Sequence, residues 1–108
     1  MDTPSTATVI ADLAAEVVVP VDGTLSRVLY KDDNLRLVLF AFDANQELTE
    51  HTAAMPAVLQ VITGSARLTL GADVTTATPG TWVHMPAHLP HSVFALEPTV
   101  LLLTMIRN

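Results

Sequence analysis

The chain has 108 residues and a formal net charge of −6; half of its residues are apolar, 15% are charged, and cysteine is absent. This composition excludes a disordered chain, disulfide bonds and thiolate chemistry, and the length suits a single domain with one core. The five basic residues are scattered along the sequence rather than grouped in a run, so we expect neither nucleic acid nor an anionic membrane as a partner.

The first 23 residues are expected to form an N-terminal extension, in which Asp12–Glu16 is the single weak helical candidate. The beginning of the chain lacks the positive start and continuous apolar core of a signal peptide. No later apolar run is long enough to cross a membrane. A cytoplasmic protein is therefore expected.

After this extension, short runs rich in Val, Leu and Ile alternate with turn-forming residues, a pattern that predicts an all-β sandwich or barrel. The expected strands are residues 24–30, 35–42, 46–53, 57–63, 66–70, 73–77, 81–85, 91–96 and 99–106. We expect residues 1–108 to form one domain and residues 35–106 to form its barrel. Gly64 and Gly80 are expected to be turn glycines.

Strand alternation predicts which side chains share a face, because successive residues point to opposite sides. Ala57, Leu59 and Val61 should lie on one face of their strand, and His91 should share its face with Val93. The strands 35–42 and 99–106 are apolar on both faces. Strands that are apolar on both faces need other protein groups packed against both faces. A small sandwich can achieve this by pairing with a second copy of itself, so we expect a homodimer.

Two histidines, His51 and His91, stand in distinctive local frames. The first frame runs from Asn45 to Gly64 (NQELTEHTAAMPAVLQVITG) and the second from Gly80 to Ala95 (GTWVHMPAHLPHSVFA). Together they resemble the two motifs of the cupins, which are small β-barrel proteins. The first cupin motif reads Gly, five residues, His-x-His, three or four residues, Glu, six residues, Gly. The second reads Gly, five residues, Pro-x-Gly, two residues, His, three residues, Asn.

This resemblance implies a double-stranded β-helix, or jelly-roll barrel, with a site at the barrel mouth. In metal-binding cupins, two histidines and a glutamate of the first motif and the histidine of the second motif hold a divalent ion. His51 and His91 match two of these four positions, whereas the other two are Ala53 and Ala57. The resemblance thus implies a zinc, iron, manganese or nickel ion bound with modest affinity by His51 and His91.

Two imidazoles hold a metal weakly, because protein sites normally supply three or four ligands. His88, three residues before His91, is a possible third ligand. It occupies the position of the glycine in the Pro-x-Gly of the second motif, and Asn45 occupies the position of the first glycine of the first motif. Both residues are therefore expected at turns with positive φ. We expect the pocket around the two histidines to be mostly apolar and lined by Ala53, Ala57, Leu59 and Met85.

Three functions remain open at this point. The first is a metal-binding cupin, and the second is a metal-free module in which the same imidazoles hydrogen-bond a small-molecule ligand. The third is a metal-free enzyme that uses one histidine as a general base. The sequence contains no Gly-x-Ser-x-Gly motif and no glycine-rich phosphate loop, so nothing in it decides whether the protein is an enzyme.

Overall fold

A computed structural model describes residues 3–107. It contains one short 3₁₀ turn, η1, and nine strands. Their bounds are η1 Leu13–Glu16, β1 Thr24–Lys31, β2 Leu35–Phe42, β3 Glu47–His51, β4 Ala57–Thr63, β5 Ala66–Leu70, β6 Asp73–Ala77, β7 Trp82–Met85, β8 His91–Ala95 and β9 Thr99–Ile106. All nine predicted strands are present, and their ends differ from the prediction by at most two positions. The expected helix at Asp12–Glu16 is reduced to a single 3₁₀ turn.

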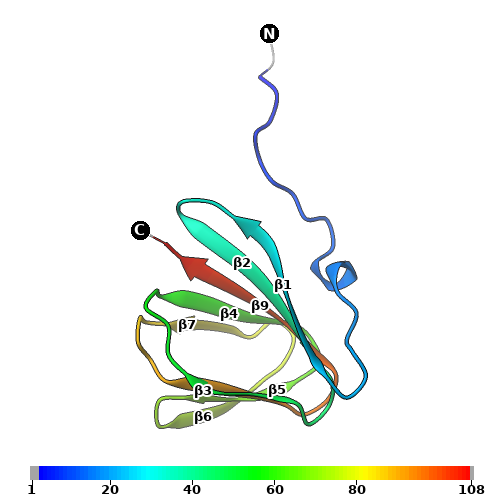
Figure 1. The fold of residues 1–108 in the computed structure, drawn as a ribbon, viewed down its shortest axis with the longest axis vertical. Helices are drawn as coiled ribbons and strands as arrows, with labels where there is room; N and C mark the ends of the chain where they lie inside the picture. Colours follow the sequence, from blue (N-terminus) through cyan, green and yellow to red (C-terminus); the bar gives the residue numbers. More distant parts are fainter. Residues whose placement is uncertain (1–2, 108) are drawn as a thin grey trace.

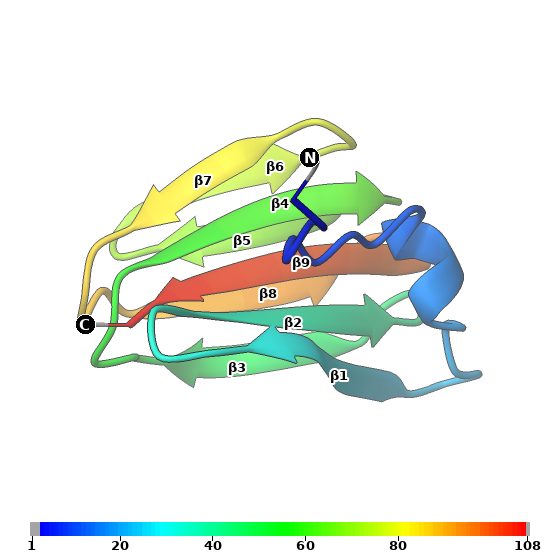
Figure 2. The ribbon, with the colours of Figure 1, turned by 90° about the horizontal axis from the view of Figure 1, so that it is seen from above.

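The strands form two antiparallel sheets that face each other (Figure 1). The first has the order β1-β2-β9-β4-β7, and the second has the order β3-β8-β5-β6. Seen from above, the larger sheet lies over the smaller one with the strands running in similar directions (Figure 2). Non-consecutive strands such as β2, β9 and β4 are neighbours, as a jelly roll requires. The predicted all-β barrel is therefore confirmed.

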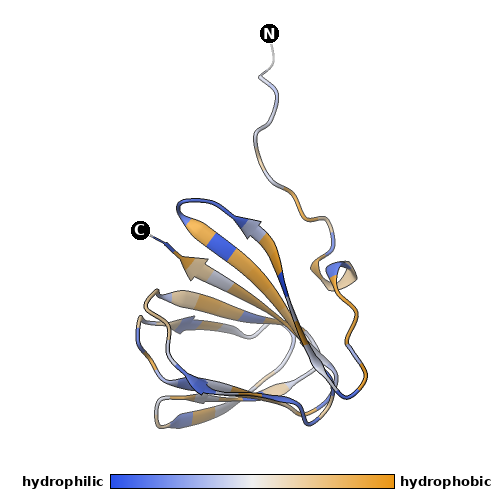
Figure 3. Ribbon diagram, in the orientation of Figure 1, coloured by the Kyte–Doolittle hydropathy of each residue, from blue (hydrophilic) through white to orange (hydrophobic). Residues whose placement is uncertain are grey.

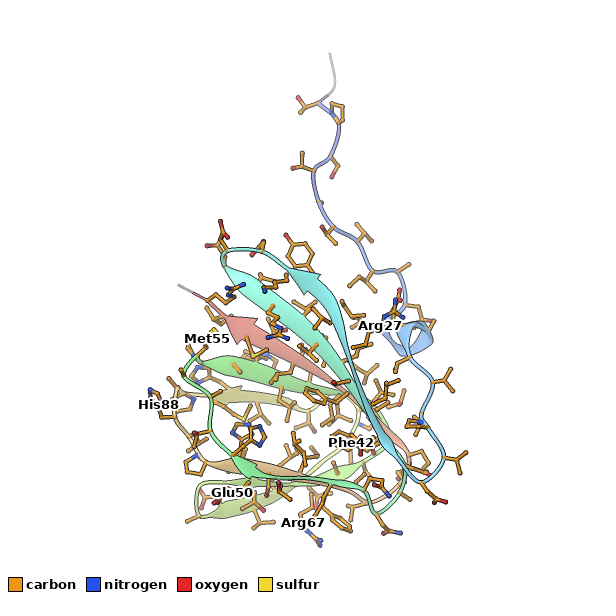
Figure 4. All side chains as sticks on the ribbon, viewed as in Figure 1. Arg27, Phe42, Glu50, Met55, Arg67 and His88 are labelled. Atoms are coloured by element: carbon orange, nitrogen blue, oxygen red, sulfur yellow. The ribbon has the colours of Figure 1, made fainter. Side chains whose placement is uncertain are left out.

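The core fills the space between the sheets, because each sheet directs one face of alternating apolar residues inward. Ala57, Leu59 and Val61 of β4 are buried, as alternation predicted, and so are His91 and Val93 of β8. Phe42, at the end of β2, is fully buried, and Figure 4 shows it between the two sheets. The intervening residues of β4 and β8, such as Val58 and Phe94, are only partly buried.

The outer face of the larger sheet has its own apolar cluster, which the chain covers by itself. Leu39, Ala41, Val100 and Leu102 are buried there, and the N-terminal residues Leu13, Val17 and Val19 pack against them. Residues 6–10, which precede this segment, lie beside Tyr30, Leu35 and Leu37 at the β1–β2 hairpin. Part of the cover that we expected from a second copy is thus supplied by the chain's own N-terminal extension.

At one end of the barrel, to the left in Figure 1, the two sheets splay apart and leave it open. There β1, β3, β7 and β9 end while β2, β4 and β8 begin. Asn45 and His88 have φ values of 67° and 68°, so the two motif positions that normally hold glycine do adopt the predicted left-handed conformation. Residues 3–107 include no helix with the length and apolar character needed to cross a bilayer.

Candidate functional site

A cavity of about 210 Å³ lies between the sheets at this open end. Loops and strand ends from both sheets contribute to its wall. The lining residues are Phe40, His51, Ala53, Met55, Ala57, Met85, Pro86, Leu89, His91, Leu103 and Met105. Nine of these eleven are apolar, so the cavity is an apolar chamber whose two imidazoles provide its polar groups.

The two imidazoles lie side by side because His51 is paired directly with His91 in the β3–β8 ladder. Their ring centroids are 4.0 Å apart and the ring planes are inclined by 62°, an edge-to-face arrangement. His91 is 8% exposed, while His51 is partly exposed toward the mouth. The two motif-end histidines therefore form one polar spot.

A β-bulge gives His51 this position. The β3–β8 register shifts between Leu48 and His51, so one additional residue is accommodated in β3. Leu48 packs against the core, and simple alternation from it would turn Glu50 inward and His51 outward. With the bulge, His51 lines the cavity, and Glu50 lies on the outside of the smaller sheet (Figure 4).

Each imidazole is held by a hydrogen bond of the same kind to a backbone carbonyl group. Nδ1 of His51 lies 2.9 Å from the carbonyl oxygen of Thr49, and Nδ1 of His91 lies 2.8 Å from that of Leu89. A carbonyl oxygen can only accept, so Nδ1 carries the hydrogen in each ring. In the neutral tautomer Nε2 then keeps its lone pair, available to a hydrogen-bond donor or to a cation.

The predicted lining residues divide into two groups. Ala53, Ala57 and Met85 border the cavity. Leu59 does not: it lies two positions farther along β4, away from the mouth, and is buried in the core at 5% exposure.

Five of the residues that line the cavity were not predicted from the sequence. They are Phe40, Pro86, Leu89, Leu103 and Met105. Phe40, Leu103 and Met105 come from β2 and β9, which the sequence shows to be apolar on both faces. Their position beside β4, however, depends on long-range strand pairing.

His88, the possible third ligand, does not line the cavity. Its side chain is exposed, and Figure 4 shows it at the outer edge of the mouth. Its backbone N–H donates to the carbonyl oxygen of Ala53 at 2.7 Å, so the residue joins two loops of the rim. Within residues 3–107, no three His, Cys, Asp or Glu side chains gather closely enough to hold a metal ion.

No family model matches the sequence, and no curated protein is significantly similar to it. Solved structures are similar over nearly the whole chain. A conserved protein of unknown function from Streptococcus pyogenes is 29% identical, with a TM-score of 0.83 over 99% of this chain and 93% of that one. A cupin superfamily protein from Desulfitobacterium hafniense is 19% identical, with a TM-score of 0.84 and coverage of 97% and 94%.

A third similar structure is an RmlC-like cupin from Desulfovibrio desulfuricans. It is 24% identical, with a TM-score of 0.81 over 93% of this chain and 96% of that one. These likenesses confirm the cupin barrel predicted from the two histidine frames. They concern the fold alone, because one fold carries many unrelated activities.

Proposed function

We propose that this protein, which has the cupin fold, binds a small and largely apolar molecule in the cavity, and that His51 and His91 bind the polar group of that molecule. The observation that carries the proposal is the pair of Nε2 atoms in an otherwise apolar chamber. A concave apolar site with a few convergent polar groups is the usual form of a small-molecule site. The cavity volume of about 210 Å³ suits a ligand of several carbon atoms.

The alternative of a purely structural histidine pair is less well supported. A structural imidazole in a core normally uses both nitrogens, because a buried polar atom without a partner costs about 1–3 kcal/mol. Here each ring has its hydrogen bond at Nδ1 only, and neither Nε2 is among the buried unpaired atoms of the described residues, so both Nε2 atoms are accessible. The remaining nitrogen is therefore the one that a ligand can use.

Hexanamide is a suitable probe, since it joins an apolar chain to an N–H donor. Added to the ¹⁵N-labelled protein at up to about 10 mM, a range that detects Kd values in the millimolar range, it should shift the amide resonances around the cavity. Ala57→Leu, which fills the chamber, should abolish these shifts, and His51→Ala or His91→Ala should weaken binding several-fold. His84→Ala is the matched control, because His84 is exposed on the outer face of β7. Absence of any shift at the cavity residues would contradict the proposal.

A divalent ion is the second candidate occupant, and the shared tautomer of the two rings favours it. Imidazole is a good ligand for zinc, iron, manganese and nickel, and a backbone contact at Nδ1 orients Nε2 toward a metal. His51 and His91 would hold the ion, which would supply Lewis-acid polarisation of a bound oxygen group. With two protein ligands, the ligand molecule or water would complete the coordination, so the affinity should be modest.

Elemental analysis tests this second candidate. After incubation with each metal and desalting, a near-stoichiometric ion that is lost in both His51→Ala and His91→Ala would establish the metal site. His84→Ala should keep the ion, and His88→Ala should keep it too, because that side chain lies outside the cavity. If none of the four metals is retained, the cavity is a metal-free binding site and the first candidate stands alone.

A further inference from the structure

Two positively charged residues lie next to the cavity wall, on the two strands that follow Met105 across the larger sheet. Lys31 ends β1, Arg36 is the second residue of β2, and the two are directly paired across the strands. From this juxtaposition we infer that the ligand carries an anionic head group, with a carboxylate as the simplest case, and that Arg36 and Lys31 bind it. The inference rests on the proposed function, because it specifies the chemistry of the molecule that enters the same cavity.

Strand register puts Arg36 on the cavity side of the larger sheet. Phe40 and Phe42 of the same strand face the core, so alternation directs Arg36 to that face. Its partner in β9 is Met105, which lines the cavity. Met105 pairs in turn with Ala57, another lining residue. Arg36 thus continues the row of side chains that forms the rim.

Arg36 interrupts a strand that is otherwise apolar. Leu35 and Leu37 flank it, and Figure 3 shows β2 as hydrophobic with a hydrophilic band near its beginning. The Nε atom of Arg36 is buried and has no hydrogen-bond partner in the described part of the chain. A buried donor on a charged group is costly when it is unpaired, so an arginine retained in this state needs a partner from outside.

The positive charge of Lys31 increases the energetic cost of the unpaired Arg36 side chain. Residues paired directly across antiparallel strands point to the same face, and like charges in such a pair are destabilising. The ion pair found within residues 3–107 is Arg27–Glu16, and Arg27 is paired with Leu39 of the outer-face cluster rather than with an inward-facing residue. An anion between Arg36 and Lys31 would remove both the repulsion and the unsatisfied donor.

The acidic residues of the adjacent turn, Asp32 and Asp33, form no ion pair with Lys31 or Arg36 within the described residues. The carboxylate of Asp32 accepts hydrogen bonds from the Tyr30 hydroxyl at 2.6 Å and from the amides of Asn34 and Leu35 at 2.7 and 2.9 Å. Asp33 is exposed in the turn. Arg107 is also at this end, where its guanidinium donates to the carbonyl oxygen of Asp32 at 2.9 Å. Three of the five basic residues of a chain with net charge −6 therefore gather beside the mouth.

The inferred ligand has two different ends. The planar guanidinium of Arg36 matches a carboxylate, and Lys31 adds a second charge. The apolar body would lie against Phe40, Met55 and Met105, and the opposite, polar end would reach the imidazoles. Methionine side chains adapt readily to different shapes, which suits this middle region.

A comparison of two probes of the same length tests the inference. Hexanoate and hexanamide differ in charge but hardly in size, so their Kd ratio, measured by NMR titration at pH 7 and low salt, reports on the anion site. A charge-assisted hydrogen bond corresponds to a preference for hexanoate of about tenfold or more. Added salt should reduce the preference, because exposed charges such as Lys31 are screened.

Two variants and a control locate the preference. Arg36→Gln should make the two Kd values nearly equal, and Lys31→Gln should reduce their ratio while leaving the core untouched, since Lys31 is exposed. Arg67→Gln is the matched control, because Arg67 lies on the smaller sheet over the ring of Phe94, 4.9 Å from its centroid. This control should keep the full preference. Each variant's fold is checked from its amide spectrum.

The possible results separate the two proposals. Equal binding of both probes by the unsubstituted protein would overturn the anion inference and leave the small-molecule cavity standing. A preference that persists in both Arg36→Gln and Lys31→Gln would also overturn it. Failure of both probes to bind, with or without zinc, would overturn the inference and the proposed function together.

Discussion

At Gly64, the first residue after β4, the backbone has no room for a side chain. Its φ is +82°, and a Cβ atom there would lie 2.2 Å from the carbonyl oxygen of Pro98 and 2.6 Å from Oγ1 of Thr99. Gly80 has a similar φ of +94°, but a Cβ atom there would meet nothing within 4 Å. The sequence presents both as turn glycines, and only the first is also a close contact between segments.

The two glycines therefore predict different costs for the same substitution. Gly80→Ala should lower the free energy of unfolding by about 1–2 kcal/mol, the cost of a left-handed alanine. Gly64→Ala adds a backbone clash to that cost and should lose more than about 4 kcal/mol, or fail to fold. Urea denaturation measures both. Similar values for the two variants would show that the segment 97–99 moves away from Gly64 at little cost.

At the scale of elements, the turn between β1 and β2 depends on one carboxylate. Asp32 accepts hydrogen bonds from the Tyr30 hydroxyl and the amides of Asn34 and Leu35. These bonds favour the ionised form and hold the pKa of Asp32 below its ordinary value, with the Tyr30 hydroxyl as the largest cause. A lowered pKa means that the folded state is stabilised when the carboxylate is charged.

The sign of the resulting pH dependence follows from linkage. Above the unfolded pKa of about 3.9, the contribution of Asp32 is fully present, and it is lost as the pH falls through the lower folded value. Asp32→Ala should therefore lower the melting temperature at pH 7, and the difference from the unsubstituted protein should shrink as the pH falls below about 3.9. Asp33→Ala, in the same exposed turn, is the control and should change little. A difference that stays constant from pH 7 to pH 2.5 would contradict the assigned role of the Asp32 charge.

At the scale of the whole molecule, we propose that a second copy of the chain covers the part of the larger sheet's outer face that the N-terminal segment does not cover. Trp82, on the edge strand β7, is 60% exposed, and Ile106 on the outer face of the same sheet is 39% exposed. Large apolar side chains on one sheet face are typical of an interface between subunits. Because Leu13, Val17 and Val19 already cover the neighbouring cluster, the open part lies toward β7.

The single tryptophan makes this proposal measurable. Light scattering at micromolar concentration should give the mass of a dimer, and dilution should shift the emission of Trp82 to longer wavelength as its ring returns to water. Trp82→Glu should shift the equilibrium to the monomer. Val74→Glu is the control, because Val74 is 61% exposed on the edge of the opposite sheet. A monomeric mass together with concentration-independent emission would rule out the dimer.

Much of this molecule is determined locally and could be predicted from the sequence alone. The turn residues delimit the strands, and the period-two pattern assigns buried faces such as that of Ala57, Leu59 and Val61. The turn positions Asn45 and His88 adopt the expected left-handed conformation, whereas the cupin barrel was implied by the resemblance of the two histidine frames to the cupin motifs. Each of these features depends on a few consecutive residues, because backbone sterics and alternation act over short distances.

Only the tertiary structure decided what meets at the mouth of the barrel. The bulge before His51 turns its ring inward, and pairing between distant strands brings Phe40 and Met105 to the cavity wall. The same pairing aligns Lys31 with Arg36, in a sequence whose basic residues look scattered. The physical reason is that strand register is set by the packing of the whole core, and a shift of one residue reverses the face of every side chain that follows.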